Sequence, residues 1–305
     1  MSRPTDRALG IALVTGGTVL WSTGGLFVRL LDLDNWTMQA WRSLFGALTL
    51  LVIIAGQHGR RTAHAFRSIG FVGIVAVPVS AISMFTYVVA LKLTTVANVM
   101  VVYATVPFIA AAVAFIWNGE RSHRRTIVAS AIALIGVGIM MGSATRGGDL
   151  AGNALSLVMT LAFSILLVMA RRYPSLSMAP INALAAGLCA LVCWPLMPGI
   201  SVSSRELVIL AAFGTATMGL SYLLFLTGGR RIPSGEAGLI GLLEVVLGPL
   251  WVWLGFGEVP ARSAIIGGTL VLGAVVWYLS NGRTWAIKPI KPAVVRQSEV
   301  SENPN

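Results

Sequence analysis

The stretch ANVMVVYATVPFIAAAVAFIWNGE at residues 97–120 and the stretch GLIGLLEVVLGPLWVWLGFGE at residues 238–258 decide how the chain folds. Each is apolar, contains a proline and ends in a Gly-Glu pair, and the two pairs stand 138 residues apart. A helix that crosses a membrane needs about 20 mostly apolar residues. Both stretches meet that length, so the sequence predicts two membrane helices at matching positions of a duplicated chain.

The composition of the whole chain indicates an integral membrane protein. Its 305 residues are 56% hydrophobic and only 11% charged, whereas a soluble domain is about 45–50% apolar and about 25% charged. This argues against a soluble enzyme, a nucleic-acid-binding domain and a disordered chain. The net charge of +11 fits basic residues that flank membrane spans. Cys189 and Cys193 stand one helical turn apart in an apolar stretch and indicate no disulfide framework.

Ten apolar segments of membrane-spanning length follow one another, separated by short polar breaks. They are predicted at residues 8–28, 37–56, 70–92, 96–117, 126–144, 151–170, 178–198, 206–227, 235–256 and 261–280. Ten similar helices predict an all-α membrane protein with two five-helix repeats, at residues 8–144 and 150–280. Because five is odd, the second repeat must be inverted relative to the first, as in many secondary transporters.

The first helix of each predicted repeat supports this duplication. At an offset of 142 residues the matching pairs are Gly10 and Gly152, Ala12 and Ala154, Leu13 and Leu155, Thr18 and Thr160, Ser22 and Ser164, and Arg29 and Arg171.

The basic residues predict which way the helices run. If the N-terminus is inside and the helices alternate, sixteen Lys and Arg residues fall on the inside and six on the outside. Basic residues gather on the cytoplasmic side of a membrane protein. The sequence therefore predicts a multi-pass protein of the inner (plasma) membrane, with a cytoplasmic N-terminus at residues 1–7 and a flexible cytoplasmic tail at residues 281–305.

The chain resembles the EamA branch of the drug/metabolite transporter superfamily. The resemblance is carried by WSTGGLFVR at 21–29, WR at 41–42 and the two stretches at 97–120 and 238–258. In that family a proline lies thirteen residues before the glutamate of the first Gly-Glu pair, as Pro107 does here. The resemblance implies ten spans in two repeats and the export of amino acids, other metabolites or toxic organic cations.

The second repeat departs from the family pattern at one position. The family often has Glu-Pro fourteen residues before the glutamate of the second Gly-Glu pair. Here Glu244 has that spacing from Glu258, but Val245 follows it, and Pro249 comes four residues later. The departure leaves the local shape of this helix open.

Glu244 is the most informative candidate residue. It lies about ten residues into its predicted helix, which is about 15 Å deep at the helical rise. A charge near the middle of a membrane costs roughly 3 kcal/mol or more, so such residues usually face a cavity and mark a pathway. Glu244 is expected to bind a substrate ammonium group or to exchange protons. The alternative is a protonated carboxyl group that is hydrogen-bonded to a neighbouring helix.

Polar and aromatic side chains that share helical faces are further candidates. Aromatic rings suit a planar or cationic substrate, although packing between helices is the alternative role for each polar or aromatic residue. Ser80 shares a face with Ser83, and Thr217 lies in the same helix as Tyr222. With Glu244, the predicted substrate-binding residues are Trp21, Ser22, Ser83, Tyr87, Asn98, Tyr103, Phe163, Ser164 and Tyr222.

Three further features have open interpretations. Pro107 and Pro249 lie in corresponding helices and are predicted hinges beside the binding site, with ordinary kinks as the alternative. Arg42 is expected either to snorkel outward or to attract a carboxylate. Small residues predict close packing of the last helices of the two repeats, within one chain or between two. These small residues are Gly138, Gly142, Gly267, Gly268 and Gly273.

These features favour a secondary transporter over an enzyme. The three histidines fall in predicted loops, and no metal-ligand, nucleophile or nucleotide-binding motif occurs. We therefore expect no cofactor, no metal, no nucleic acid and no direct use of ATP. The expected function is export of neutral and aromatic amino acids by alternating access, with a small molecule and the lipid bilayer as partners. The alternative is a multidrug exporter of organic cations. Proton coupling and oligomeric state stay open.

Overall fold

A computed structural model describes residues 4–118, 124–142, 147–173, 176–199, 202–229, 231, 240–241 and 243–279. Within these residues seven helices are long and apolar enough to cross a membrane, and three shorter apolar helices lie at Ile127–Ile139, Leu243–Phe256 and Arg262–Trp277. Together they correspond to the ten predicted spans, so the all-α membrane fold is confirmed. Residues 1–3, the predicted tail at 281–305 and the first Gly-Glu pair lie outside the described residues.

Several spans consist of more than one helical segment. The first half contains α1 (Pro4–Ser22), α2 (Gly24–Leu30), α3 (Asn35–His58), η1 (Gly59–Arg61), α4 (Thr62–Arg67), α5 (Gly70–Leu93), α6 (Val96–Tyr103), α7 (Val106–Asn118) and α8 (Arg124–Gly142). The second half contains α9 (Gly147–Arg172), α10 (Met178–Cys193), η2 (Trp194–Leu196), α11 (Ser204–Gly214), η3 (Thr215–Leu220), α12 (Ser221–Gly229), α14 (Leu243–Phe256) and α15 (Arg262–Leu279).

The outer surface is apolar and part of the interior is polar. Large hydrophobic side chains such as Ile116, Phe71 and Leu191 are 82%, 80% and 73% exposed. Asn153 and Thr160 on α9 are fully buried. A soluble protein would not expose so much contiguous apolar surface, whereas a lipid environment favours it. The chain is therefore a multi-pass membrane protein.

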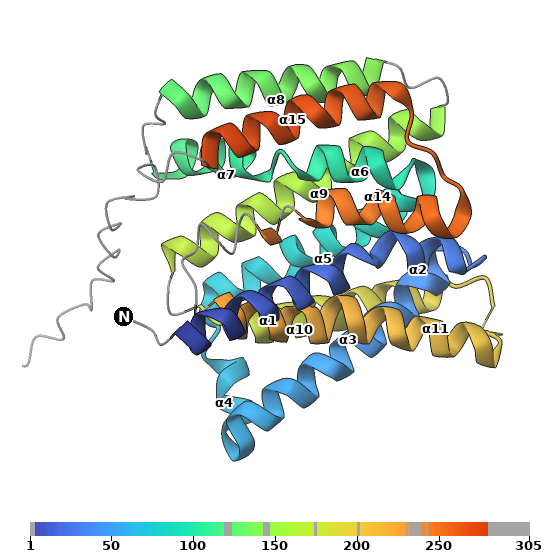
Figure 1. Cartoon of the computed structure of the whole chain (residues 1–305). Coiled ribbons are helices and arrows are strands. Elements are labelled where there is room, and N and C mark those ends of the chain that lie inside the picture. Colours follow the sequence, from blue (N-terminus) through green and yellow to red (C-terminus); the bar gives the residue numbers. More distant parts are fainter. Residues whose placement is uncertain are drawn as a thin grey trace, which may run out of the picture.

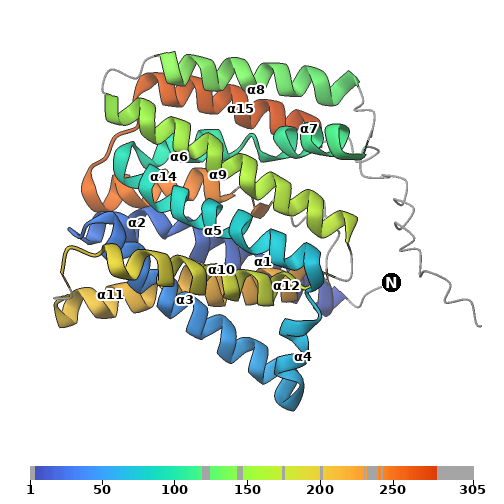
Figure 2. The ribbon, with the colours of Figure 1, turned by 180° about the vertical axis from the view of Figure 1, so that it is seen from behind.

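The packing of the helices repeats when each span is exchanged for its counterpart five spans away. α8 packs on α15, α3 on α10 and α6 on α14, and each of these pairs joins two counterparts. Other contacts occur in matching pairs. The contact of α1 with α12 corresponds to that of α9 with α5, and the contact of α3 with α11 corresponds to that of α10 with α5. Figures 1 and 2 show α8 beside α15 at one edge of the bundle and α3 towards the other. This exchange pattern is that of two inverted five-helix repeats.

The last helices of the two repeats make contact through a glycine that the sequence analysis did not select. A Cβ added to Gly136 on α8 would lie 2.7 Å from the carbonyl oxygen of Gly267 on α15. A Cβ added to Gly138 or Gly273 would have no neighbour within 4 Å. The close approach of α8 and α15 is therefore as predicted. The glycine of α8 that lies at the contact is Gly136, and Gly138 does not lie there. The contact lies within one chain.

Gly214 allows α11 to rest directly on the backbone of α3. A Cβ added there would lie 2.8 Å from the backbone nitrogen of Gly46, and backbone atoms cannot move aside cheaply. We expect Gly214→Val to lower the free energy of unfolding by about 1–3 kcal/mol, measured as a lower midpoint of thermal unfolding in detergent. Gly187→Val on α10 is the matched control, because open space surrounds Gly187. Equal midpoints for the two variants would contradict this account.

Three spans lose regular α-helical geometry in the same part of the bundle. The first span is broken at Thr23 between α1 and α2, and the fourth at Ala104 and Thr105 between α6 and α7. The eighth span is wound as a π-helix over Thr215–Leu220. Such irregular turns in helices often lie at functional sites. Here they lie beside Trp21 and Tyr103 and include Thr217, three residues that line the cavity described next.

Candidate functional site

A cavity of about 390 Å³ lies between the two halves of the chain. This volume is within the range of small-molecule sites. Its walls come from α1, α3, α5 and α6 of the first half and from α9, α10, η3, α12 and α14 of the second. The lining residues are Trp21, Arg42, Ser80, Ser83, Met84, Tyr87, Met100, Tyr103, Met159, Phe163, Leu166, Leu167, Ala170, Met178, Asn182, Thr217, Met218, Tyr222, Phe225, Leu226 and Glu244.

The cavity extends towards one end of the bundle. We call the end at which α1 begins the near end, and the end at which α2 finishes the far end (Figure 1). Ala170 lies in the last turn of α9 and Met178 is the first residue of α10, so both belong to the near end. Both residues line the cavity. The lining of the cavity therefore reaches the near ends of α9 and α10.

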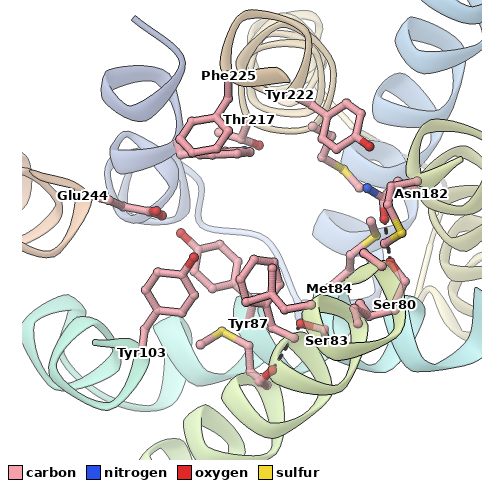
Figure 3. A pocket seen from close by; sticks show the side chains of 18 of the residues that line it. Ser80, Ser83, Met84, Tyr87, Tyr103, Asn182, Thr217, Tyr222, Phe225 and Glu244 are labelled. Carbon is pink, nitrogen blue, oxygen red and sulfur yellow. Dashed lines mark hydrogen bonds between the residues drawn. The ribbon is translucent and has the colours of Figure 1, made fainter. Parts of the chain in front are cut away.

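Glu244 lies on the wall of the cavity that α14 forms. Its side chain is only 8% exposed, and its carboxylate points into the cavity from α14, on the side where Tyr103 lies (Figure 3). Among the described residues, no hydrogen bond or ion pair links this carboxylate to another side chain. The arrangement differs from the alternative of a carboxyl group bonded to a neighbouring helix. A carboxylate so placed can hold a cationic group of a substrate or take up a proton.

Arg42 faces the cavity and does not snorkel outward, so the outward alternative is wrong. Its side chain is 5% exposed, and its guanidinium carbon lies 4.6 Å from the centre of the Phe213 ring and 5.9 Å from that of Tyr87. The close approach of α11 at Gly214 brings Phe213 to this position, and cation–π contact favours the inward orientation. No described carboxylate pairs with Arg42, so its charge is free to attract an anionic group.

Aromatic and sulfur-containing side chains form much of the remaining wall. The ring centres of Trp21 and Phe225 lie 4.8 Å apart, and those of Tyr103 and Phe163 lie 5.7 Å apart. Tyr87, whose ring centre lies 5.9 Å from the Arg42 guanidinium carbon, lines the cavity together with Arg42 and Glu244. The lining also includes five methionines, whose flexible side chains adapt to irregular shapes. These are Met84, Met100, Met159, Met178 and Met218.

At the far end, hydrogen bonds tie the first half to the second. Arg29 donates from Nε to Glu258 Oε2 at 2.7 Å, and from Nη2 to the Thr94 carbonyl oxygen at 3.0 Å. Glu258 Oε1 accepts the backbone N–H of Val96 at 2.9 Å. Thr94 Oγ1 also donates to Asp149 Oδ1 at 3.2 Å. We call the Arg29–Glu258 pair with these backbone partners the far-end latch, because it crosses between the halves beyond the cavity.

A sequence profile decides the family. The profile of the EamA-like transporter family matches residues 8–142 and again residues 150–280. The chain belongs to the EamA-like transporter family. This EamA-like chain is also 26% identical over 273 residues to an uncharacterized transporter of Archaeoglobus fulgidus, a match that covers 88% of this chain and 95% of the relative. A solved crystal structure shares the fold with a TM-score of 0.63 at 18% identity, covering 92% of this chain and 98% of the other.

In this EamA-like transporter, most of the residues predicted from sequence lie around one cavity. The seven that line it are Trp21, Ser83, Tyr87, Tyr103, Phe163, Tyr222 and Glu244. Whether they bind substrate stays a prediction.

Three predicted residues, Ser22, Asn98 and Ser164, are not among the residues that line the cavity. Ser22 donates to the Val19 carbonyl oxygen at 2.7 Å and accepts from Trp251 Nε1 at 2.8 Å. Ser164 donates to the Thr160 carbonyl oxygen at 2.7 Å. Asn98 donates to Thr94 Oγ1 at 2.9 Å, close to the far-end latch. Their polar groups make hydrogen bonds within and between helices, and whether they contact a substrate stays a prediction.

The two predicted hinge prolines have different surroundings. The chain leaves the helix at Ala104 and Thr105, just before Pro107, and resumes as α7. A proline cannot donate the backbone hydrogen bond that would continue the helix there. Pro249 instead lies inside α14, which is one helix from Leu243 to Phe256. A matching interruption is therefore visible at Pro107 and not at Pro249 in the described part of α14. Movement at either proline stays a prediction.

Several lining residues were not selected from the sequence. Asn182 on α10 accepts a hydrogen bond from Ser80 on α5 at 2.9 Å. Asn182 falls one helical turn after Met178 in the predicted seventh span, and a polar amide at that depth was a signal that could have been used. The five methionines gave no such signal, because an apolar side chain in a membrane helix is equally suited to lipid.

Proposed function

We propose that this transporter exports neutral and aromatic amino acids, with Glu244 binding the ammonium group and Arg42 the carboxylate. The aromatic and methionine walls then hold the side chain of the amino acid. One observation carries the proposal: a carboxylate and a guanidinium, neither of which forms an ion pair with another described residue, line the same apolar cavity. A buried charge without a partner is costly. A zwitterion carries an ammonium group and a carboxylate, and so matches the signs of both charges.

Arg42 also weighs against the second candidate, an exporter of lipophilic organic cations. Glu244 and the aromatic rings suit a cation, but a cation gains nothing from the guanidinium of Arg42 and is repelled by it. An amino acid and its decarboxylated amine share the ammonium group and the side chain and differ in the carboxylate alone. Comparison of these two molecules therefore tests the role of Arg42.

Transport proceeds by alternating access between two arrangements of the halves. In the arrangement described here the cavity reaches the near end, and the far-end latch joins the halves at the other. The excess of basic residues supports a cytoplasmic near end in the inner membrane. Substrate then enters from the cytoplasm, and opening of the latch with closure of the near end releases it outside.

The proposal is tested by efflux from proteoliposomes preloaded with phenylalanine, phenethylamine, leucine and tetraphenylphosphonium. Mass spectrometry compares their release with that from protein-free vesicles. Faster release of phenylalanine and leucine is the expected result. Release of phenethylamine and tetraphenylphosphonium without the amino acids would replace the proposal by the organic-cation exporter. Release of none of the four would contradict both.

Replacement of Arg42 should remove the preference for the amino acid over its amine. We expect Arg42→Gln to lower phenylalanine efflux by roughly tenfold or more, because a hydrogen bond to a charged group contributes about 1.5–3 kcal/mol. Phenethylamine efflux should stay level or rise. Arg67→Gln, which removes the same charge from an exposed position on α4, is the control. An equal fall for both substrates would indicate a structural role for Arg42.

A further inference from the structure

A polar pair lies on the wall of the cavity across from Glu244 (Figure 3). Ser80 on α5 donates a hydrogen bond from Oγ to Oδ1 of Asn182 on α10, at 2.9 Å. Both residues line the cavity. Figure 3 shows this pair on one wall and Glu244 on the wall across from it. A molecule whose ammonium group contacts Glu244 would therefore direct its other end towards Asn182.

The amide of Asn182 has donors that no described residue uses. A primary amide carries one acceptor oxygen and two N–H donors on its nitrogen. The oxygen accepts the bond from Ser80, which helps to orient the amide, and Nδ2 makes no hydrogen bond to another described residue. Met84 and Met178 also line the cavity, and a thioether is only a weak acceptor. The Nδ2 donors are thus available to a ligand in the cavity.

We propose that Asn182, held by Ser80, is a specificity-determining residue that selects the side chain of the transported amino acid. It favours a side chain whose far end carries a hydrogen-bond acceptor, such as the phenolic oxygen of tyrosine, over an apolar one of the same shape. The reason is general: a site that hydrogen-bonds a substrate hydroxyl discriminates strongly against the analogue without it, since the polar group of the site is then left unpaired. The inference depends on the proposed function.

The test measures efflux of tyrosine and phenylalanine from the same proteoliposomes, with threonine and valine as a control pair whose hydroxyl group lies too close to the ammonium group to reach Asn182. Each pair differs by the presence of a hydroxyl group with little change of shape. We expect the wild type to release tyrosine about tenfold faster than phenylalanine at low internal concentration, since a hydrogen bond of this kind changes affinity by about that factor. Asn182→Leu should lower tyrosine efflux more than phenylalanine efflux, so that the ratio falls to about one.

Two further variants separate specificity from damage to the fold. Ser80→Ala removes the bond that fixes the amide and should give a tyrosine preference between those of the wild type and Asn182→Leu. Met178→Leu, one helical turn away on α10, should change the efflux of all four amino acids by the same factor. Each variant is first checked for an unchanged midpoint of thermal unfolding in detergent.

The possible results separate this inference from the proposed function. If the wild type releases tyrosine and phenylalanine equally, the inference about Asn182 is wrong and the proposed function stands. If Asn182→Leu lowers the efflux of both by the same factor, the residue is structural and the inference is again wrong. If the wild type releases neither amino acid, both the inference and the proposed function fail.

Discussion

Glu244→Gln is expected to reduce amino acid efflux by roughly 30-fold or more and to make the remaining efflux insensitive to pH. Truncating one partner of a buried charge pair weakens the free energy of binding by about 2–5 kcal/mol, and about 1.4 kcal/mol corresponds to a tenfold change in affinity. Glutamine keeps the size of the side chain and a hydrogen-bond acceptor but has no negative charge. The ammonium group of the substrate would then lack its partner in the cavity.

The pH dependence follows from the protonation of this carboxylate. A protonated Glu244 cannot pair with an ammonium group, so wild-type efflux should fall as the pH on the near-end side is lowered. The Gln variant has no proton to gain at this position, and its efflux should not change with that pH.

Glu206→Gln is the matched control for charge and size. Glu206 forms a capping box with Ser203 at the start of α11, and glutamine can replace glutamate in such a box. Amino acid efflux by the Glu206→Gln variant, and its dependence on pH, should equal those of the wild type. Unchanged efflux together with an unchanged pH profile in Glu244→Gln would exclude the proposed role of Glu244.

The fold was predictable because membrane spans can be recognised from local sequence. Each span must satisfy its backbone hydrogen bonds internally, so an apolar run such as residues 97–120 predicts a helix without knowledge of its neighbours. The matching run at residues 238–258 then predicts the duplication. Part of the cavity lining was predictable for a similar reason, because the carboxylate of Glu244 stands out near the middle of its apolar span and the tyrosines Tyr87 and Tyr103 stand out within theirs.

The orientation of side chains was less predictable, because it depends on contacts between spans. Arg42 turns inward because Phe213 packs beneath its guanidinium, and this position of Phe213 depends on the contact of Gly214 with α3. The hydroxyl group of Ser164 is bonded to a carbonyl oxygen one turn earlier in its own helix. A polar residue on a membrane helix is compatible with a cavity or with such a bond, and sequence spacing alone does not separate the two.

The far-end latch predicts a second large effect, on which end of the cavity is open. Glu258→Gln and Arg29→Gln each remove the ion pair that joins the halves, and we expect the cavity to become several-fold to tenfold more accessible from the far end. Arg29 and Glu258 are about one-fifth exposed, so water screens part of their attraction. The hydrogen bonds of Arg29 to the Thr94 carbonyl oxygen and of the Val96 N–H to Glu258 add to the stability of the latch.

Accessibility is measured with a single reporter cysteine. Ser83→Cys, a lining position, is introduced with Cys189→Ala and Cys193→Ala, and is labelled by a membrane-impermeant maleimide from each side of oriented vesicles. With the latch intact, labelling should come mainly from the near-end side. In either Gln variant, labelling from the far-end side should rise. The double variant should show no further increase, because both changes break one interaction.

The Arg231–Asp6 pair provides the control for removal of an ion pair. Arg231 lies 3.2 Å from Asp6 at the near end, and the two side chains are 33% and 48% exposed. An exposed pair of this kind contributes little to the balance between conformations, so Arg231→Gln should not change labelling from either side.

If Glu258→Gln behaves like Arg231→Gln, the halves are held together at the far end by apolar packing, and the latch does not control access. If far-end labelling rises in Glu258→Gln alone, the bond from Val96 to Glu258 controls access and the contact with Arg29 does not.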